Sequence, residues 1–278
     1  MTAVQDFQGK PRPVASEMPE LFQNYMDLRF VHKAILISLK NRFVYVRVPK
    51  VANSSVKFSI YNNERLPGTS EIKERIIHDI HYGPVIRPGL LGFDSEILNE
   101  ALFGDTFFRF TFVRNPYAKA LSNFLDRYQA EDCSVRKLTD RIARRRRIVA
   151  PDTSDMNFSQ FLQTIEKIPA KRMEIHISPQ STQLMIGLVD YHEICPFENI
   201  TAEWNRIGSK LWKGFKPSFD NKSPSRTDAG QKLSTYFDLD NIRRVNRIYE
   251  QDFVNLGYKM LDRPEDFLKA GAIEREAP

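Results

Sequence analysis

Two groups of polar side chains have the residue types and the spacing needed to bind an anion. Residues 48–55 have the sequence Val-Pro-Lys-Val-Ala-Asn-Ser-Ser and join a predicted strand to a predicted helix. The backbone N–H groups at the start of a helix have no intrahelical partner and attract anions. Lys50 adds a positive charge there, and Ser54 and Ser55 add hydroxyl groups. The segment therefore predicts an anion-binding loop.

The second group follows another predicted strand. Residues 112–117 have the sequence Phe-Val-Arg-Asn-Pro-Tyr, and Ser122 lies on the helix that we expect to begin near Pro116. The guanidinium of Arg114 offers a fork of donors that suits a phosphate dianion. Arg114 and Ser122 together predict a phosphate site.

Each group also has a purely structural interpretation. Lys50 can be a solvated loop residue, with Ser54 as a plain helix N-cap. Arg114 can pair with a carboxylate while Ser122 faces solvent. A conventional nucleotide-binding P-loop is disfavoured, because it needs Gly-x-x-x-x-Gly-Lys-Ser/Thr and residues 10–67 contain no glycine. The occurrence of both groups, each directly after a strand, favours the functional interpretation.

The elements that must position these groups alternate along the chain. Strands are predicted at 43–48, 108–113 and 191–195, and the stretch around His32, ahead of the first strand, is expected to be helical. Further helices are predicted at 54–61, 116–129, 132–147, 157–168, 201–211 and 239–255. This alternation favours an α/β fold with a central parallel sheet covered by helices on both faces.

Composition excludes several classes of protein. The 278 residues are 41% hydrophobic and 27% charged, which is typical of a globular chain rather than a disordered or fibrous one. The net charge of +6 favours anionic ligands. The two cysteines, Cys133 and Cys195, are expected to be free thiols, since two cannot make a disulfide scaffold. No apolar run is long enough for a membrane span or a signal peptide, so we expect a cytoplasmic protein.

The motifs resemble those of the carbohydrate sulfotransferase family over roughly residues 43–258. Residues 48–55 are similar to the family's 5′-phosphosulfate loop, and residues 112–117 with Ser122 are similar to its 3′-phosphate site. Weaker likenesses follow in the family's order: His176-Ile-Ser-Pro-Gln180, the strand that ends in the Phe-Glu-Asn turn at 197–199, Asn221-Lys-Ser223 and residues 249–253.

The resemblance implies a P-loop-like, three-layer fold and a donor, 3′-phosphoadenosine 5′-phosphosulfate. It implies that Lys50 contacts the bridging oxygen of the phosphosulfate and that Arg114 and Ser122 bind the 3′-phosphate. The remaining donor-binding residues that it implies are Val51, Ala52, Asn53, Ser54, Ser55 and Ser223. No metal is expected to be required, because the transferred sulfonate carries less charge than a phosphoryl group.

Sulfuryl transfer to a hydroxyl also needs a base, and histidine suits that role near neutral pH. His78 and His81 lie between the two donor motifs, where related enzymes have a catalytic histidine; His81 is preferred because the adjacent Gly-Pro turn can fix its direction. His176 is the next candidate and, with Gln180, is expected to bind the acceptor. His192 and His32 are expected to be packing or surface residues.

The strongest charge run in the chain lies in the helix predicted at 132–147. It comprises Arg136, Lys137, Arg141, Arg144, Arg145, Arg146 and Arg147. Such a run is often only a solvated face, but it can also guide an anionic polymer. No nucleic-acid-binding motif accompanies it, so Arg144 and Arg145 are expected to attract an anionic saccharide rather than DNA; peripheral contact with a membrane stays open.

We expect one catalytic domain at 21–262, an N-terminal arm at 1–20 and a C-terminal tail at 263–278. Two other functions remain open from the sequence. A nucleotide kinase or NTPase can share the P-loop-like fold, although the glycines it needs are absent. A non-catalytic protein can bind polyanions through the arginine run alone. Neither the acceptor nor the oligomeric state follows from the sequence.

Overall fold

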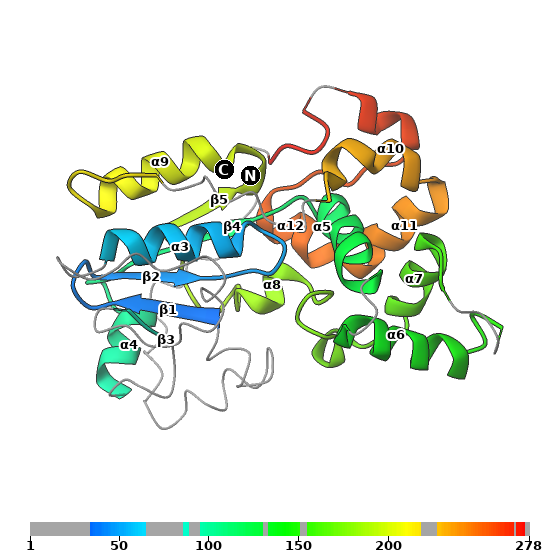
Figure 1. Ribbon diagram of the computed structural model, residues 1–278, viewed down its shortest axis with the longest axis horizontal. Coiled ribbons are helices and arrows are strands. Elements are labelled where there is room, and N and C mark those ends of the chain that lie inside the picture. Colours follow the sequence, from blue (N-terminus) through cyan, green and yellow to red (C-terminus); the bar gives the residue numbers. More distant parts are fainter. Residues whose placement is uncertain are drawn as a thin grey trace. The chain divides into compact units, whose positions relative to one another are not determined.

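The computed structural model describes residues 34–64, 86–88, 95–129, 133–150, 155–217, 227–269 and 271–275. These residues form two compact units (Figure 1). Unit 1 contains the described residues of Met1–Val113, Thr182–Cys195 and Asn199–Ser223. Unit 2 contains those of Arg114–Ser181, Pro196–Glu198 and Pro224–Pro278. The predicted limits of the arm, the catalytic domain and the tail stay predictions.

Unit 1 is built on a five-stranded sheet in the order β3-β1-β2-β4-β5. The strands are β1 (Ile35–Ser38), β2 (Phe43–Val46), β3 (Ile86–Pro88), β4 (Phe108–Val113) and β5 (Glu193–Pro196). The helices of this unit are α3 (Asn53–Glu64), α4 (Ser95–Phe103) and α9 (Ile200–Leu211), and α8 (Gln180–Gln183) has its first two residues in unit 2. The α/β class predicted from the sequence is confirmed.

The sheet is mixed rather than wholly parallel. The central pair, β2 and β4, is parallel, with Tyr45 opposite Phe110, as the alternation of elements predicted. β1 runs antiparallel to both β2 and β3. Only residues 39–42 connect β1 to β2, and so short a connection permits only antiparallel pairing. β1 was not predicted from the sequence, because its three apolar residues, Ile35 to Ile37, fit a helix as well as a strand.

Aromatic packing places α3 and α9 on one face of the sheet. Trp204 of α9 is fully buried and lies 6.1 Å from Phe110 and 5.9 Å from Phe112, measured between ring centroids. Its indole N–H donates to Ser59 Oγ of α3 at 2.9 Å. Trp212 is also buried, 5.9 Å from Trp204. Both tryptophans therefore belong to the core of unit 1.

The opposite face of β4 carries Arg109, which points toward α4. Its Nη1 donates to the carbonyl oxygen of Gly104 at 2.5 Å, directly after α4. Its backbone N–H donates to His192 Nδ1 at 3.0 Å, so His192 is a packing residue, as predicted. Helices on both faces of a central sheet give unit 1 the expected three-layer arrangement.

Unit 2 consists of helices. They are α5 (Pro116–Asn123), a π-helix (Phe124–Tyr128), α6 (Ser134–Arg145), α7 (Phe158–Ile165), α10 (Leu233–Tyr236), α11 (Leu239–Ile248) and α12 (Glu250–Leu256). The helices predicted at 116–129 and 239–255 are each divided in two: the first changes to a π-helix after Asn123, and the second breaks at Tyr249. The two cysteines are free thiols, as expected.

Residues beyond the predicted domain limit at 262 also pack within unit 2. The Phe267 ring lies 5.2 Å from that of Tyr117, on α5. Arg275 Nε donates to the carbonyl oxygen of Leu256 at 2.7 Å. Asn115 Nδ2 donates to the carbonyl oxygen of Ile273. The segment predicted to be a tail therefore contributes contacts to this unit.

Two buried charges fix the segment 174–181 of unit 2. Lys119 is fully buried in α5, and its Nζ donates to the carbonyl oxygens of His176 at 3.2 Å and Ser178 at 2.9 Å. Asp252 is fully buried in α12 and accepts from the backbone N–H groups of Gln180 at 2.8 Å and Ser181 at 2.7 Å. Burial lowers the pKa of Lys119 to about 8 and raises that of Asp252.

Replacing Asp252 with asparagine is expected to loosen this segment. The amide keeps the volume of the side chain but has one acceptor oxygen, so one of the two buried N–H groups loses its partner. We expect Asp252→Asn to lower the free energy of unfolding by about 1–3 kcal/mol, measured by urea denaturation. Asp240→Asn, on the exposed start of α11, is the matched control and should change it by less than about 0.5 kcal/mol. Equal effects would contradict the assigned role.

Candidate active site

The loop that follows β2 contains two residues in the left-handed conformation. Lys50 has a φ of 67° and Ala52 a φ of 46°. For residues other than glycine this conformation costs about 1–2 kcal/mol each. Left-handed residues in such a loop turn backbone N–H groups to one side and form a concavity that binds anions. Backbone strain of this kind is concentrated at functional sites, which supports the predicted anion-binding loop.

Helix α3 begins directly after this loop, at Asn53. Its first turn contains no acidic side chain, so its positive end is not neutralised from within the helix. Ser55 is nearly buried, while Asn53 and Ser54 are half-buried. Within the described ranges, the buried Oδ1 of Asn53 has no hydrogen-bond partner. The residues therefore fit an anionic group bound at the start of the helix.

In unit 2, Arg114 is held by the side chain of Gln180. The backbone N–H of Arg114 donates to Gln180 Oε1 at 2.9 Å, and Gln180 Nε2 donates to the carbonyl oxygen of Arg114 at 2.7 Å. Gln180 is fully buried, and both ends of its amide are used in this pair of bonds. The structure thus gives Gln180 a positioning role that the sequence analysis did not assign. Its predicted contact with an acceptor stays a prediction.

The guanidinium of Arg114 lies against the turn at 197–199. Its Cζ is 4.6 Å from the centroid of the Phe197 ring, a distance typical of a cation–π contact. Glu198 Oε1 accepts from the backbone N–H of Asn115, and Glu198 Oε2 accepts from Tyr258 Oη. Burial lowers the pKa of Arg114 to about 10, and the charge of Glu198 opposes this shift. Arg114 therefore remains a cation at neutral pH.

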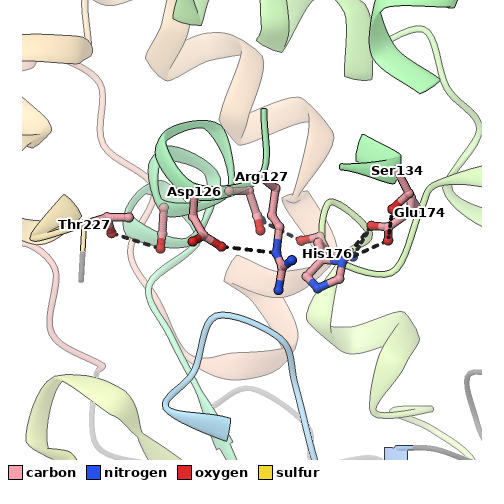
Figure 2. Close-up of polar contacts among 8 residues, drawn as sticks. Asp126, Arg127, Ser134, Glu174, His176 and Thr227 are labelled. Carbon is pink, nitrogen blue, oxygen red and sulfur yellow. Dashed lines mark hydrogen bonds and ion pairs between the residues drawn. The ribbon is translucent and has the colours of Figure 1, made fainter. Parts of the chain in front are cut away.

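The predicted partner of Arg114, Ser122, lies buried on α5. Its Oγ is 3.1 Å from Thr227 Oγ1, and either hydroxyl can be the donor. Figure 2 shows Thr227 at one end of the group of polar side chains that it draws, with Ser134 and Glu174 at the other end. If Thr227 donates, the proton of Ser122 is left for a second acceptor such as a phosphate oxygen. Thr227 is a residue that the sequence analysis missed, because it is 105 positions away along the chain.

His176 is close to a second missed residue, Glu174. Its Nδ1 lies 2.8 Å from Glu174 Oε1, and the ring is partly exposed (Figure 2). The other predicted histidines, His78 and His81, lie outside the described residues, as does Ser223. The roles predicted for all three stay predictions.

The predicted arginine run ends α6. Arg141 and Arg144–Arg147 are exposed, whereas Arg136 pairs with Asp155 at 2.5 Å. No ion pair between these exposed arginines and an acidic side chain is found in the described part of unit 2.

Among the described residues of both units, no helix is long and apolar enough to cross a membrane. The described residues also include no cluster of acidic, histidine or cysteine side chains suited to a metal ion.

Comparisons with known proteins agree with these features. The profile of the sulfotransferase family matches residues 33–259. Carbohydrate sulfotransferase 10 of Xenopus laevis is 24% identical over 83% of this chain and 69% of the relative. The human protein of that name is 24% identical over 84% of this chain and 69% of its own. Human carbohydrate sulfotransferase 14 is 24% identical over 73% of this chain and 54% of its own. No solved structure gives a significant match.

The family match includes both predicted anion sites and most of the described chain. It decides against the two alternatives that the sequence left open, a nucleotide kinase and a non-catalytic polyanion-binding protein. Because the family profile matches more than half of its residues, the chain belongs to the sulfotransferase family and is a transferase enzyme.

Proposed function

We propose that this enzyme transfers a sulfuryl group from 3′-phosphoadenosine 5′-phosphosulfate to a hydroxyl group of a carbohydrate. The observation that carries the proposal is the strained loop with left-handed Lys50 and Ala52 at the start of α3, inside the matched family region. The carbohydrate acceptor rests on the relatives, which are carbohydrate sulfotransferases. A cytoplasmic location stays a prediction.

Residues 50–55 would hold the 5′-phosphosulfate group. Lys50 supplies a positive charge, the start of α3 supplies backbone donors, and Ser54 and Ser55 supply hydroxyl groups. In-line displacement breaks the bond between sulfur and the bridging oxygen, and negative charge builds on the departing phosphate. A lysine beside that oxygen stabilises the transition state more than the bound substrate.

Arg114 and Ser122 would hold the 3′-phosphate. The guanidinium is preorganised, because Gln180 fixes its backbone and Phe197 covers one side of it. A cation that is fixed before binding loses little further freedom when the phosphate arrives. Ser122 adds a hydroxyl that is within hydrogen-bonding distance of Thr227 Oγ1.

The chemistry is expected to proceed without a divalent metal ion. A sulfonate carries less negative charge than a phosphoryl group, so Lys50, Arg114 and the helix start are adequate counter-charges. The decisive assay is transfer from radiolabelled donor to neutral N-acetyllactosamine and to anionic, unsulfated chondroitin, with and without EDTA. Failure to label any saccharide in a wider panel, together with failure to bind adenosine 3′,5′-bisphosphate, would overturn the proposed function.

Lys50→Ala is expected to lower turnover by about 100-fold or more, with a smaller change in donor affinity. The reason is that the lysine charge is matched to the leaving oxygen in the transition state. The measurement is steady-state kinetics with the purified variant, together with calorimetric binding of adenosine 3′,5′-bisphosphate. Lys40→Ala, outside the loop, is the control variant. Unchanged turnover in a folded Lys50→Ala enzyme would show that this loop is not part of the active site.

Arg114→Ala should weaken binding of adenosine 3′,5′-bisphosphate much more than binding of adenosine 5′-phosphate. A charge-assisted hydrogen bond to the 3′-phosphate contributes roughly 1.5–3 kcal/mol, which only the first ligand can lose. Calorimetry with both ligands measures the difference. Arg114→Lys keeps the charge but not the forked donors, so its affinity for adenosine 3′,5′-bisphosphate should lie between those of wild type and Arg114→Ala. Equal losses for both ligands would place Arg114 away from the 3′-phosphate.

The exposed arginines of α6 are expected to act on the acceptor alone. Replacing Arg144 and Arg145 with serine should raise the KM for chondroitin several-fold and flatten its dependence on salt, because screened long-range attraction is lost. The KM for N-acetyllactosamine should stay unchanged. Arg243→Ser, on the exposed side of α11, is the matched control. If the double variant and wild type have the same kinetics with both acceptors, the arginine run is only a solvated helix end.

A further inference from the structure

The carboxylate of Glu174 holds the His176 ring in one orientation. Its oxygens lie 2.8 and 3.0 Å from His176 Nδ1. Glu174 Oε2 also accepts from the backbone N–H of His176 at 2.7 Å, and Glu174 Oε1 accepts from Ser134 Oγ at 3.1 Å. Because a carboxylate accepts, Nδ1 carries the proton of the neutral ring. The lone pair of that tautomer is therefore on Nε2.

Nε2 is the nitrogen on the side of the ring away from Glu174, as Figure 2 shows. The His176 side chain is 21% exposed, whereas a fully buried ring would be closed to a substrate. No hydrogen bond to Nε2 is found among the described residues. A partly open imidazole with one nitrogen fixed by a carboxylate is the arrangement that proton-accepting histidines use.

The backbone of this segment is fixed from two other directions. The carbonyl oxygen of His176 accepts from Lys119 Nζ at 3.2 Å and from Asn123 Nδ2 at 2.6 Å, both on α5. Tyr249 Oη donates to the carbonyl oxygen of Ile177 at 2.9 Å. A base that is preorganised by its neighbours needs little rearrangement when the proton moves. The π-helix beside the ring adds a further sign, since such helices are frequent at functional sites.

We propose that His176 is the catalytic base of the transfer reaction and that Glu174 is its positioning residue. This rests on the proposed function. The acceptor hydroxyl loses its proton to Nε2 as its oxygen bonds to sulfur, and the bond from sulfur to the bridging oxygen breaks with its electron pair on the departing phosphate. Glu174 then stabilises the imidazolium. From the sequence alone, His81 is the preferred candidate for this role, and its contribution stays a prediction.

The charged groups facing the ring explain why it is a base at neutral pH. Burial lowers the pKa of His176, Glu174 opposes this shift, and Arg127 of the π-helix and Lys119 of α5 lower it further. Arg127 is itself paired with Asp126 at 3.1 Å (Figure 2). Since the pKa is lowered from about 6.5, the ring is neutral at pH 7 and becomes protonated, and inactive as a base, only in more acidic solution.

The pH dependence of kcat/KM tests the proposal on the acceptor that wild-type enzyme labels most strongly in the saccharide assay. Wild-type activity should fall on the acidic side with a midpoint below about 6.5. His176→Ala should reduce kcat roughly 100-fold or more and abolish that limb. Glu174→Gln should reduce kcat roughly 10- to 100-fold and move the limb to lower pH, because the charge that favours the imidazolium is gone.

Three variants distinguish proton transfer by His176 and Glu174 from a purely structural role of this pair. Glu166→Gln removes a carboxylate from an ion pair with Arg244 and Arg247 in the same unit, and its acidic limb should match that of wild type. Glu174→Asp, which retains the charge, should restore part of the lost rate. His81→Ala should keep the limb. Loss of the limb in His81→Ala, with retention in His176→Ala, would overturn the proposal.

A spectroscopic test does not depend on turnover. In nitrogen-detected NMR of labelled wild-type protein, the His176 ring should show a proton on Nδ1, none on Nε2, and a titration midpoint below about 6.5. A proton on Nε2 would overturn the proposal even if His176→Ala failed to fold. Binding of adenosine 3′,5′-bisphosphate should survive in both variants. Wild-type protein without binding or transfer would instead overturn the proposed function itself.

Discussion

The site residues of unit 2 depend on two charges buried without direct contact with water, Lys119 and Asp252. Together they hold four backbone groups of the segment 174–181. That segment carries Gln180 and His176, so one set of bonds fixes both the support of Arg114 and the orientation of the imidazole. Isolated buried charges are costly, and their desolvation is offset here by hydrogen bonds to backbone atoms. These bonds hold the irregular stretch before α8 and the first residues of that helix in one conformation.

The loop after β2 in unit 1 follows a different principle. It contains two strained residues, because Lys50 and Ala52 adopt a left-handed conformation that glycine adopts more easily, and such strain persists only where the surrounding structure enforces it. A glycine in either place would relieve the strain but allow the loop more conformations when no ligand is bound. Buried Val48 and Val51 anchor the loop to the core. The charged and hydroxyl groups are thus presented by a backbone that is ordered in advance.

Local pattern was enough to predict β4 with its observed limits, helix α9 within one residue, and the loop and arginine that follow the parallel strands. The antiparallel β1 could not be predicted in this way, because a short apolar run is compatible with either structure and its pairing is decided by the tertiary fold. Glu174 and Thr227 were missed for a related reason. Their importance lies in contacts with His176 and Ser122, and an isolated sequence does not show which partner a carboxylate or hydroxyl will meet. Lys119 lies in the predicted helix between Arg114 and Ser122, but only the structure shows that it faces inward.

Burial has opposite consequences for the two basic groups of unit 2 that we assign to the reaction. Desolvation disfavours the charged form of both, but Arg114 begins with so high a pKa that it keeps its proton at about 10. His176 begins near neutrality, so the same physical effect leaves it uncharged. Burial thus leaves Arg114 a permanent cation suited to binding a phosphate and His176 a neutral imidazole suited to accepting a proton. Because desolvation acts in the same direction on both groups, the large difference between their ordinary pKa values is what separates the two roles.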